Sequence, residues 1–178
     1  KILERNKVLR LHAEATVYGQ LVTADTTINI IDSTRLDPAN TVITIESTPD
    51  KFQEGTTPEI KLSLPAGITT AVPIPITLST AGSTATVADD YLSFSNTVTI
   101  DSAASAVAFN VNIRADDLVE KTEILKLDGT AHDGLTAFTV VGKSIDIEDS
   151  NDPSTIAFQF NFSQNPLTPG GAGALVSI

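Results

Sequence analysis

The stretch Asp116-Asp-Leu-Val-Glu-Lys-Thr-Glu123 stands between two runs of residues that we expect to form β-strands. Before it, apolar side chains alternate with small or polar ones from Val107 to Ile113, and after it comes Ile124-Leu-Lys-Leu127. Alternation with a period of two indicates a strand with one buried face. The stretch itself holds four carboxylates and one lysine in eight residues. It is either a solvated acidic turn, which is the commoner case, or a site for a hard cation such as Ca²⁺, which binds about 6–8 oxygen atoms.

The composition of the chain is that of an acidic all-β protein. The 178 residues carry a formal net charge of −11, contain no Cys, Met or Trp, and are 5% aromatic. Abundant Thr, Ser, Val and Ile, with Gly and Pro between short apolar runs, are typical of strands and turns. The charge argues against nucleic acid and against anionic membranes as partners, and no run approaches the roughly 18 apolar residues of a membrane helix. We expect a secreted or cell-surface setting, and the opening Lys1-Ile-Leu3 suggests a piece of a longer polypeptide.

An internal repeat with a period of about 115 residues divides the chain, close to the size of one immunoglobulin-like module. The matched segments are Leu3–Leu11 with Val119–Leu127, Ile28–Ser33 with Ile145–Ser150, and Asp37–Pro38 with Asp152–Pro153. We therefore predict that residues 1–38 are the C-terminal strands of a preceding module and that residues 39–152 are a complete module. Residues 153–178 would then begin a following module.

The complete module is predicted to be an immunoglobulin-like, seven-stranded β-sandwich. The expected strands span about 41–47, 58–64, 72–79, 95–101, 106–113, 123–128 and 137–148. Pro73 and Pro75 cannot donate backbone hydrogen bonds, so we expect their strand to lie at a sheet edge. In the last strand the apolar parity changes around Gly142, which predicts a β-bulge there.

Strand direction predicts where the acidic residues gather. If successive strands run up and down, four separate acidic segments meet at the pole from which the chain continues. These segments hold Glu54; Asp89 and Asp90; Asp116, Asp117, Glu120 and Glu123; and Glu148, Asp149 and Asp152. Like charges brought together without a counter-ion raise carboxylate pKa values and destabilise a fold. We therefore favour a structural Ca²⁺ site over a purely solvated cluster.

The acidic motifs resemble those of the Calx-β family. They stand here as Glu54-Gly55, Asp89-Asp90-Tyr91, Asp116-Asp117-Leu-Val-Glu120-Lys-Thr-Glu123 and Ile147-Glu-Asp149-Ser-Asn-Asp152. By this resemblance the candidate Ca²⁺ ligands are Glu54, Asp90, Asp116, Glu120, Glu123, Asp149 and the carbonyl of Leu118, with Asp117 and Asp152 in the same candidate set. Ser150 and Asn151 dilute the closing motif, which implies fewer or weaker ions. In the first repeat, Lys7 stands where Glu123 stands in the second, which implies a poorer site.

These features predict a structural, non-catalytic role. We expect a Ca²⁺-stiffened tandem-repeat segment of a stalk, adhesin or filament. Its expected partners are neighbouring modules or head-to-tail copies of itself, completed by strand complementation, together with a host or cell-surface ligand. His12 and His132 have no nucleophile motif beside them. The alternative is a ligand- or carbohydrate-binding module of a large extracellular protein or enzyme, although the lack of Trp weakens a carbohydrate platform.

Overall fold

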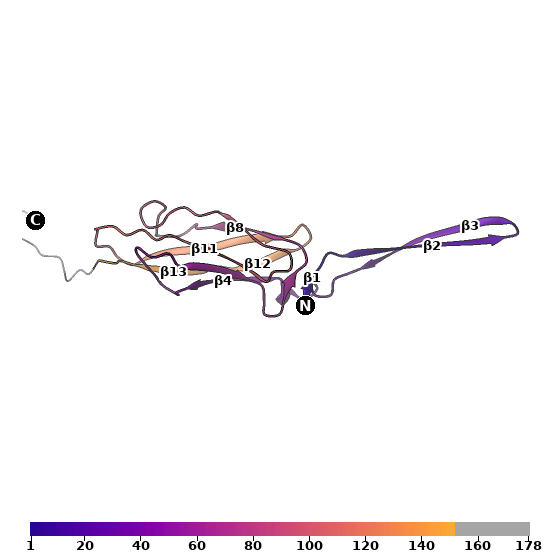
Figure 1. Cartoon of the computed structure of the whole chain (residues 1–178), viewed down its shortest axis with the longest axis horizontal. Coiled ribbons are helices and arrows are strands. Elements are labelled where there is room, and N and C mark those ends of the chain that lie inside the picture. Colours follow the sequence, from indigo (N-terminus) through magenta and orange to yellow (C-terminus); the bar gives the residue numbers. More distant parts are fainter. Residues whose placement is uncertain (152–178) are drawn as a thin grey trace, which may run out of the picture.

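Figure 1 shows a computed structural model of the chain, in which residues 1–151 are described. They form a β-sandwich and a long N-terminal hairpin (Figure 1). The hairpin projects from the end of the sandwich opposite to the end where the chain passes residue 151 (Figure 1). The predictions for Asp152 and for residues 153–178 lie outside the described residues.

Every regular element of residues 1–151 is a strand, apart from one short 3₁₀ turn, η1 (Pro38–Thr41). The strands are β1 (Ile2–Leu3), β2 (Lys7–Val17), β3 (Gln20–Ile30), β4 (Val42–Thr48), β5 (Phe52–Gln53), β6 (Glu59–Ser63), β7 (Thr69–Thr70), β8 (Ile74–Ser79), β9 (Thr97–Ile100), β10 (Ala106–Asn110), β11 (Glu123–His132), β12 (Ala137–Val141) and β13 (Lys143–Glu148). The seven predicted strands correspond in order to β4, β6, β8, β9, β10, β11 and, as two separate strands, β12 and β13, whereas β5 and β7 were not predicted. Strand β11 runs four residues further than expected, and β10 stops three residues earlier.

The sandwich forms because its strands carry apolar residues on one face only. Ile43 and Ile45 of β4, and Leu125 and Leu127 of β11, are buried while the residues between them are exposed. Strands β4, β6 and β10 pair antiparallel as one layer, and β9, β8, β11, β13 and β5 pair as the other. Strand β12 pairs with β11 and, in parallel, with β4. Side chains from both layers belong to one buried cluster, as in other two-sheet folds.

The edge position expected for the proline-containing strand is wrong. Strand β8 pairs with β11 on one side and with β9 on the other, so β9 has the outer position. Pro75 fits because β8 pairs with β11 only from Ile76 onward, which leaves no hydrogen bond to lose at Pro75 on that side. A proline can therefore lie in an inner strand where one of its two ladders has already ended.

The β-bulge expected near Gly142 is confirmed by the strand register. Leu127 and Ala131 of β11 pair with Lys143 and Phe138, so four steps along β11 lie opposite five steps along β12 and β13. A Cβ atom at Gly142 would lie 2.9 Å from the carbonyl oxygen of Leu127. Glycine is required here because the two backbones approach too closely for any side chain.

The hairpin of β2 and β3 pairs over its whole length, and every residue in both strands is exposed. Tyr18 (φ 50°) and Gly19 (φ 77°) form its tip. Positive φ at both residues of a two-residue loop is the feature of a type I′ turn, whose twist matches that of the strands.

The register of the hairpin reproduces that of β11 with β13. Leu9 pairs with Ile28 in the first as Leu125 pairs with Ile145 in the second. The equivalent pairs are Lys7–Ile30 with Glu123–Ile147, Val8–Asn29 with Ile124–Asp146, Leu9–Ile28 with Leu125–Ile145, Arg10–Thr27 with Lys126–Ser144 and Leu11–Thr26 with Leu127–Lys143. The repeat seen in the sequence therefore extends to strand pairing.

The packing does not divide at residue 38. Leu3 is fully buried in the core of the sandwich, and β1 pairs in parallel with β7. Residues 1–3 thus contribute to the sandwich, while β2 and β3 leave it. The assignment of residues 1–38 to the end of a preceding module stays a prediction.

Candidate metal centre

The acidic segments meet at one end of the sandwich, as the strand order predicts. The Glu120 backbone N–H donates to Asp149 Oδ2 (2.8 Å), and Ser150 Oγ donates to Glu54 Oε2 (3.1 Å). Asn151 Nδ2 joins the turn after β13 to the carbonyl oxygen of Asp116 (2.9 Å). Three segments far apart in the sequence are therefore held together by direct contacts.

An open hollow of about 390 Å³ lies at this end. It is lined by Thr86, Asp89, Asp90, Arg114, Asp116, Leu118, Glu120 and Glu123. Five of these side chains are carboxylates and one is a guanidinium. No ion pair joins Arg114 to any of them within residues 1–151, so the hollow keeps an excess of negative charge.

Desolvation, and after it the surrounding negative charge, raises the pKa of two of the carboxyl groups. Desolvation, followed by the charges of Asp116, Asp90, Glu54 and Asp149, raises the pKa of Glu120 above its usual range. Desolvation, a hydrogen bond with Asp90 and the charges of Asp90, Glu120 and Glu54 raise the pKa of Glu123 to about 7. Both shifts make the ionised form of these two groups less favourable in the folded chain.

Glu123 and Asp90 form the least satisfied contact of the site. Glu123 Oε2 is buried and has no hydrogen-bond donor among the described residues. Asp90 is buried too, and its Oδ2 accepts from the Thr86 N–H at 2.5 Å. Two ionised carboxylates can only accept, so this pair is hydrogen-bonded only while one of them holds a proton. A bound cation would satisfy both groups in their ionised form.

The structure brings most, but not all, of the predicted ligands together. Asp117 is exposed and does not line the hollow, and neither Glu54 nor Asp149 is among its lining residues. The Leu118 carbonyl oxygen accepts a hydrogen bond from Asn151 Nδ2 at 2.8 Å. In residues 1–151 no three His, Cys, Asp or Glu side chains are drawn together closely enough to hold a metal ion as they stand. The assignment of these residues as ligands stays a prediction.

Three residues of this end were not assigned to the site from the sequence. Thr86 donates its N–H to Asp90 and its hydroxyl to Asp89 (2.9 Å), so it orients two carboxylates. Arg114 lines the hollow, and Asn151 ties two loops together. Position in the sequence gives a signal for Arg114, two residues before the acidic stretch, and for Asn151, which lies inside the closing motif. The contacts themselves depend on how the loops cross.

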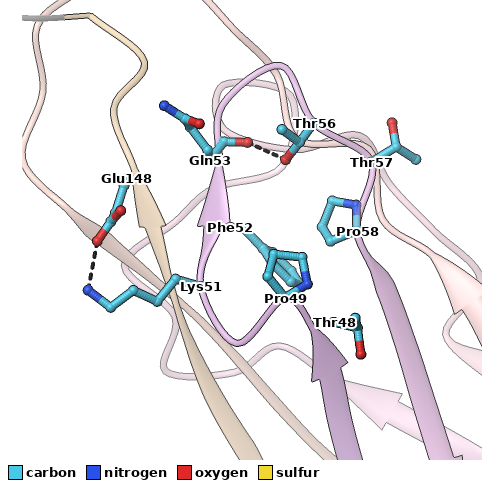
Figure 2. Close-up of a pocket in the computed structure, with 9 residues that line it drawn as sticks. All are labelled: Thr48, Pro49, Lys51, Phe52, Gln53, Thr56, Thr57, Pro58 and Glu148. Atoms are coloured by element: carbon cyan, nitrogen blue, oxygen red, sulfur yellow. Dashed lines mark hydrogen bonds and ion pairs between the residues drawn. The ribbon is translucent and has the colours of Figure 1, made fainter.

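A second hollow of about 400 Å³ lies beside β5 and is drawn in Figure 2. Lys51 and Glu148 point toward each other across its rim, with Nζ and Oε1 2.7 Å apart (Figure 2). They are the only charged groups among its lining residues, and they neutralise each other. Among residues 1–151, the only exposed aromatic side chain is that of Tyr18 at the hairpin tip. Neither feature forms the aromatic platform that a carbohydrate-binding module would need.

Comparisons with known proteins give only remote similarities. No protein-family model and no curated protein sequence matches the chain. The crystal structure of the apo form of the Calx CBD1 domain is 14% identical, with a TM-score of 0.46 over 62% of this chain and 99% of that one. The calcium binding domain CBD12 of CALX1.1 is 14% identical, with a TM-score of 0.46 over 60% of this chain and 44% of that one. The human F-spondin reeler domain is 8% identical, with a TM-score of 0.38 over 60% and 89%.

With TM-scores below 0.5, these similarities carry no argument about what this chain binds. The all-β sandwich is established by the strand pairing itself. No helix within residues 1–151 has the length and apolar character to cross a bilayer.

Proposed function

We propose that this chain is a non-catalytic, Ca²⁺-stiffened segment of tandem β-sandwich modules in a secreted or cell-surface stalk, adhesin or filament. The observation that carries the proposal is the buried Oε2 of Glu123, which has no donor in residues 1–151 and lies beside Asp90 where four acidic segments meet. The donors gathered there are oxygen atoms, the type that Ca²⁺ prefers. The resemblance of the four sequence motifs points to the same ion.

The residues that would hold the ion come from separate loops. They are Glu54, Asp90, Asp116, Glu120, Glu123 and Asp149, with the carbonyl oxygen of Leu118. When bound, Ca²⁺ supplies positive charge and a flexible coordination sphere. The protein contributes the loop contacts already made by Asp149 and Asn151, which keep the turn after β13 against the acidic stretch. A bound Ca²⁺ would therefore make the turn after β13 more rigid, because movement of that turn would separate ligands of the same ion.

Calorimetric titration with Ca²⁺, combined with thermal melting in chelator and in millimolar Ca²⁺, tests the proposal. At a concentration 100 times Kd the ion would stabilise the fold by about 2.7 kcal/mol, which corresponds to a rise in Tm of roughly 5–10 °C. Glu123→Gln should lose most of this rise, whereas Glu59→Gln, an exposed acid on β6, should keep it. Identical melting of the wild-type chain in chelator and in Ca²⁺ would remove the metal from the proposal.

Neighbouring modules, or other copies of the chain, are the partners that we propose for the hairpin. One of its faces is mostly apolar and is exposed. This face is made of Leu9, Leu11, Ala13, Ala15, Val17, Val22, Ala24, Thr26, Ile28 and Ile30, with Lys7 and Gln20 at its two ends. An exposed apolar sheet face of this length is typical of a surface that another protein segment covers. A mass measurement that finds a single, discrete monomer at all concentrations would count against assembly from copies and leave completion by neighbouring modules.

A further inference from the structure

The turns that follow β3 and β13 are built from the same hydrogen bonds. Asp32 Oδ2 accepts from the Glu4 N–H at 2.8 Å, as Asp149 Oδ2 accepts from the Glu120 N–H at 2.8 Å. The other oxygen of each aspartate accepts from a backbone N–H two residues further on. These second contacts are Thr34 N to Asp32 Oδ1 (2.9 Å) and Asn151 N to Asp149 Oδ1 (2.6 Å).

The two turns differ in the charge of one neighbouring side chain. At the first turn, Lys7 Nζ lies 3.1 Å from Glu4 Oε1. At the second, the residue equivalent to Lys7 in the strand register is Glu123, a carboxylate in place of an ammonium group, and Glu120 adds its negative charge to the surroundings of Glu123. At the same register position, the first turn therefore has a positive side chain that offsets its negative charge. The second turn has a further carboxylate there.

Arg35 supplies a second positive charge at the first turn, and it does so from a buried position. Its side chain is 7% exposed, and its guanidinium lies between the carboxylates of Asp32, whose Oδ2 is 3.6 Å from Nε, and Asp133, whose Oδ2 is 2.5 Å from Nη2. The contact between Arg35 Nη2 and Asp133 Oδ2 is an ion pair and not a hydrogen bond, because the N–H groups of Nη2 do not point at that oxygen. Nε also donates to the Glu4 carbonyl oxygen, and Nη1 donates to Thr136 Oγ1 (3.1 Å).

These contacts join the hairpin to the sandwich. Asp32 and Glu4 flank the hairpin, whereas Asp133 and Thr136 belong to the turn between β11 and β12. Two carboxylates, a carbonyl and a hydroxyl supply oxygen atoms of the type that a hard cation binds. Here the guanidinium of Arg35 lies among them. Backbone N–H groups of Thr136 and Leu135, together with Arg35, outweigh desolvation and lower the pKa of Asp133, so its carboxylate stays ionised against the guanidinium.

We propose that Arg35 is the built-in cation of the first junction: it fixes the hairpin on the sandwich without a metal, whereas the junction after β13 depends on a cation from solution. The second half rests on the proposed Ca²⁺ site, and the first half does not. The chain would thus have one junction that is insensitive to calcium and one that is sensitive. The planar guanidinium suits this role because it can contact several oxygen groups in fixed directions at once.

Distance measurement between two spin labels tests the first half directly. The chain has no cysteine, so Thr27→Cys on β3 and Thr139→Cys on β12, both exposed, give unique labelling sites. In the wild-type background we expect one narrow distance distribution that is the same in Ca²⁺ and in chelator. Arg35→Gln should widen it at least twofold under both conditions. Arg10→Gln, which changes an exposed arginine of the hairpin, should leave it narrow.

Arg35→Lys guards against a variant that fails to fold, because it keeps the charge but cannot reach all the oxygen groups together. It should widen the distribution less than Arg35→Gln does. A wild-type distribution that widens in chelator, or an unchanged distribution in both Arg35 variants, would overturn the proposal. Calorimetry separates the two claims: absence of Ca²⁺ binding removes the metal site after β13 and leaves the role of Arg35 intact.

Discussion

The hairpin and the strand pair β11–β13 share one pairing register but differ completely in burial. Leu125 and Ile145 are fully buried, whereas their equivalents Leu9 and Ile28 are 45% and 46% exposed. The register is fixed within each pair of strands, by the turn and by the alternation of apolar residues. Burial is fixed by what packs on the face. Within residues 1–151, the sandwich covers the apolar face of the β11–β13 pair and leaves the equivalent face of the hairpin exposed. A partner that covers this chain would therefore be detected at the hairpin face.

The largest effect should come from removing equivalent isoleucines in the two regions. Ile145→Ala removes a fully buried side chain and should lower the free energy of unfolding by about 3–4 kcal/mol. Ile28→Ala, at the same register position of the hairpin, should cost less than about 1 kcal/mol. Urea denaturation of both variants measures the difference. Similar losses in both would mean that the hairpin face is covered in solution, and that the two regions are alike in burial as well as in register.

A smaller effect should appear in the pH dependence of the metal-free protein. The pKa of Glu123 is about 7 in the folded chain against an ordinary value of 4.5, so the folded state holds the proton more tightly. Its contribution to stability is fully present below about pH 4.5 and is lost as the pH rises through about 7. We expect a loss of about 1–2 kcal/mol, allowing for partial exposure.

Denaturation in chelator between pH 4.5 and 7.5 checks this expectation. Glu123→Gln should flatten the dependence, whereas Lys7→Gln, at the equivalent position of the hairpin, should leave it unchanged. Metal-free stability that rises over this interval would contradict the account of the acidic end.

The smallest effect concerns the polar face of the hairpin. His12 Nδ1 lies 2.5 Å from Asp25 Oδ1, and Nε2 lies 3.0 Å from Glu14 Oε1. The hydrogen bonds with Asp25 and then with Glu14 raise the pKa of His12 above 6.5. Asp25→Asn should bring the value back toward 6.5 in an NMR titration, with no measurable change in global stability because all three groups are exposed. An ordinary pKa for His12 in the wild-type chain would show that these contacts do not persist in water.

Much of the fold was predictable because alternation and repetition are local signals. The strand order, the bulge at Gly142 and the gathering of Glu54, Asp90 and Asp149 near the acidic stretch all follow from period-two patterns and strand direction. The inner position of β8 could not be predicted, because a proline in the sequence indicates only that one backbone hydrogen bond is missing. It cannot report where the neighbouring strand ends, which is why Pro75 suggested an edge.

The functional contacts, like the fold, were predictable only in part. The sequence by itself determined which carboxylates are available and that the turns after β3 and β13 share an aspartate, since side-chain type and spacing set those local hydrogen bonds. Only the tertiary structure decided that Arg35 reaches Asp133 and that Glu123 faces Asp90 without a donor in residues 1–151. These contacts join residues about 100 and 30 positions apart, and their strength depends on burial, which no local pattern records.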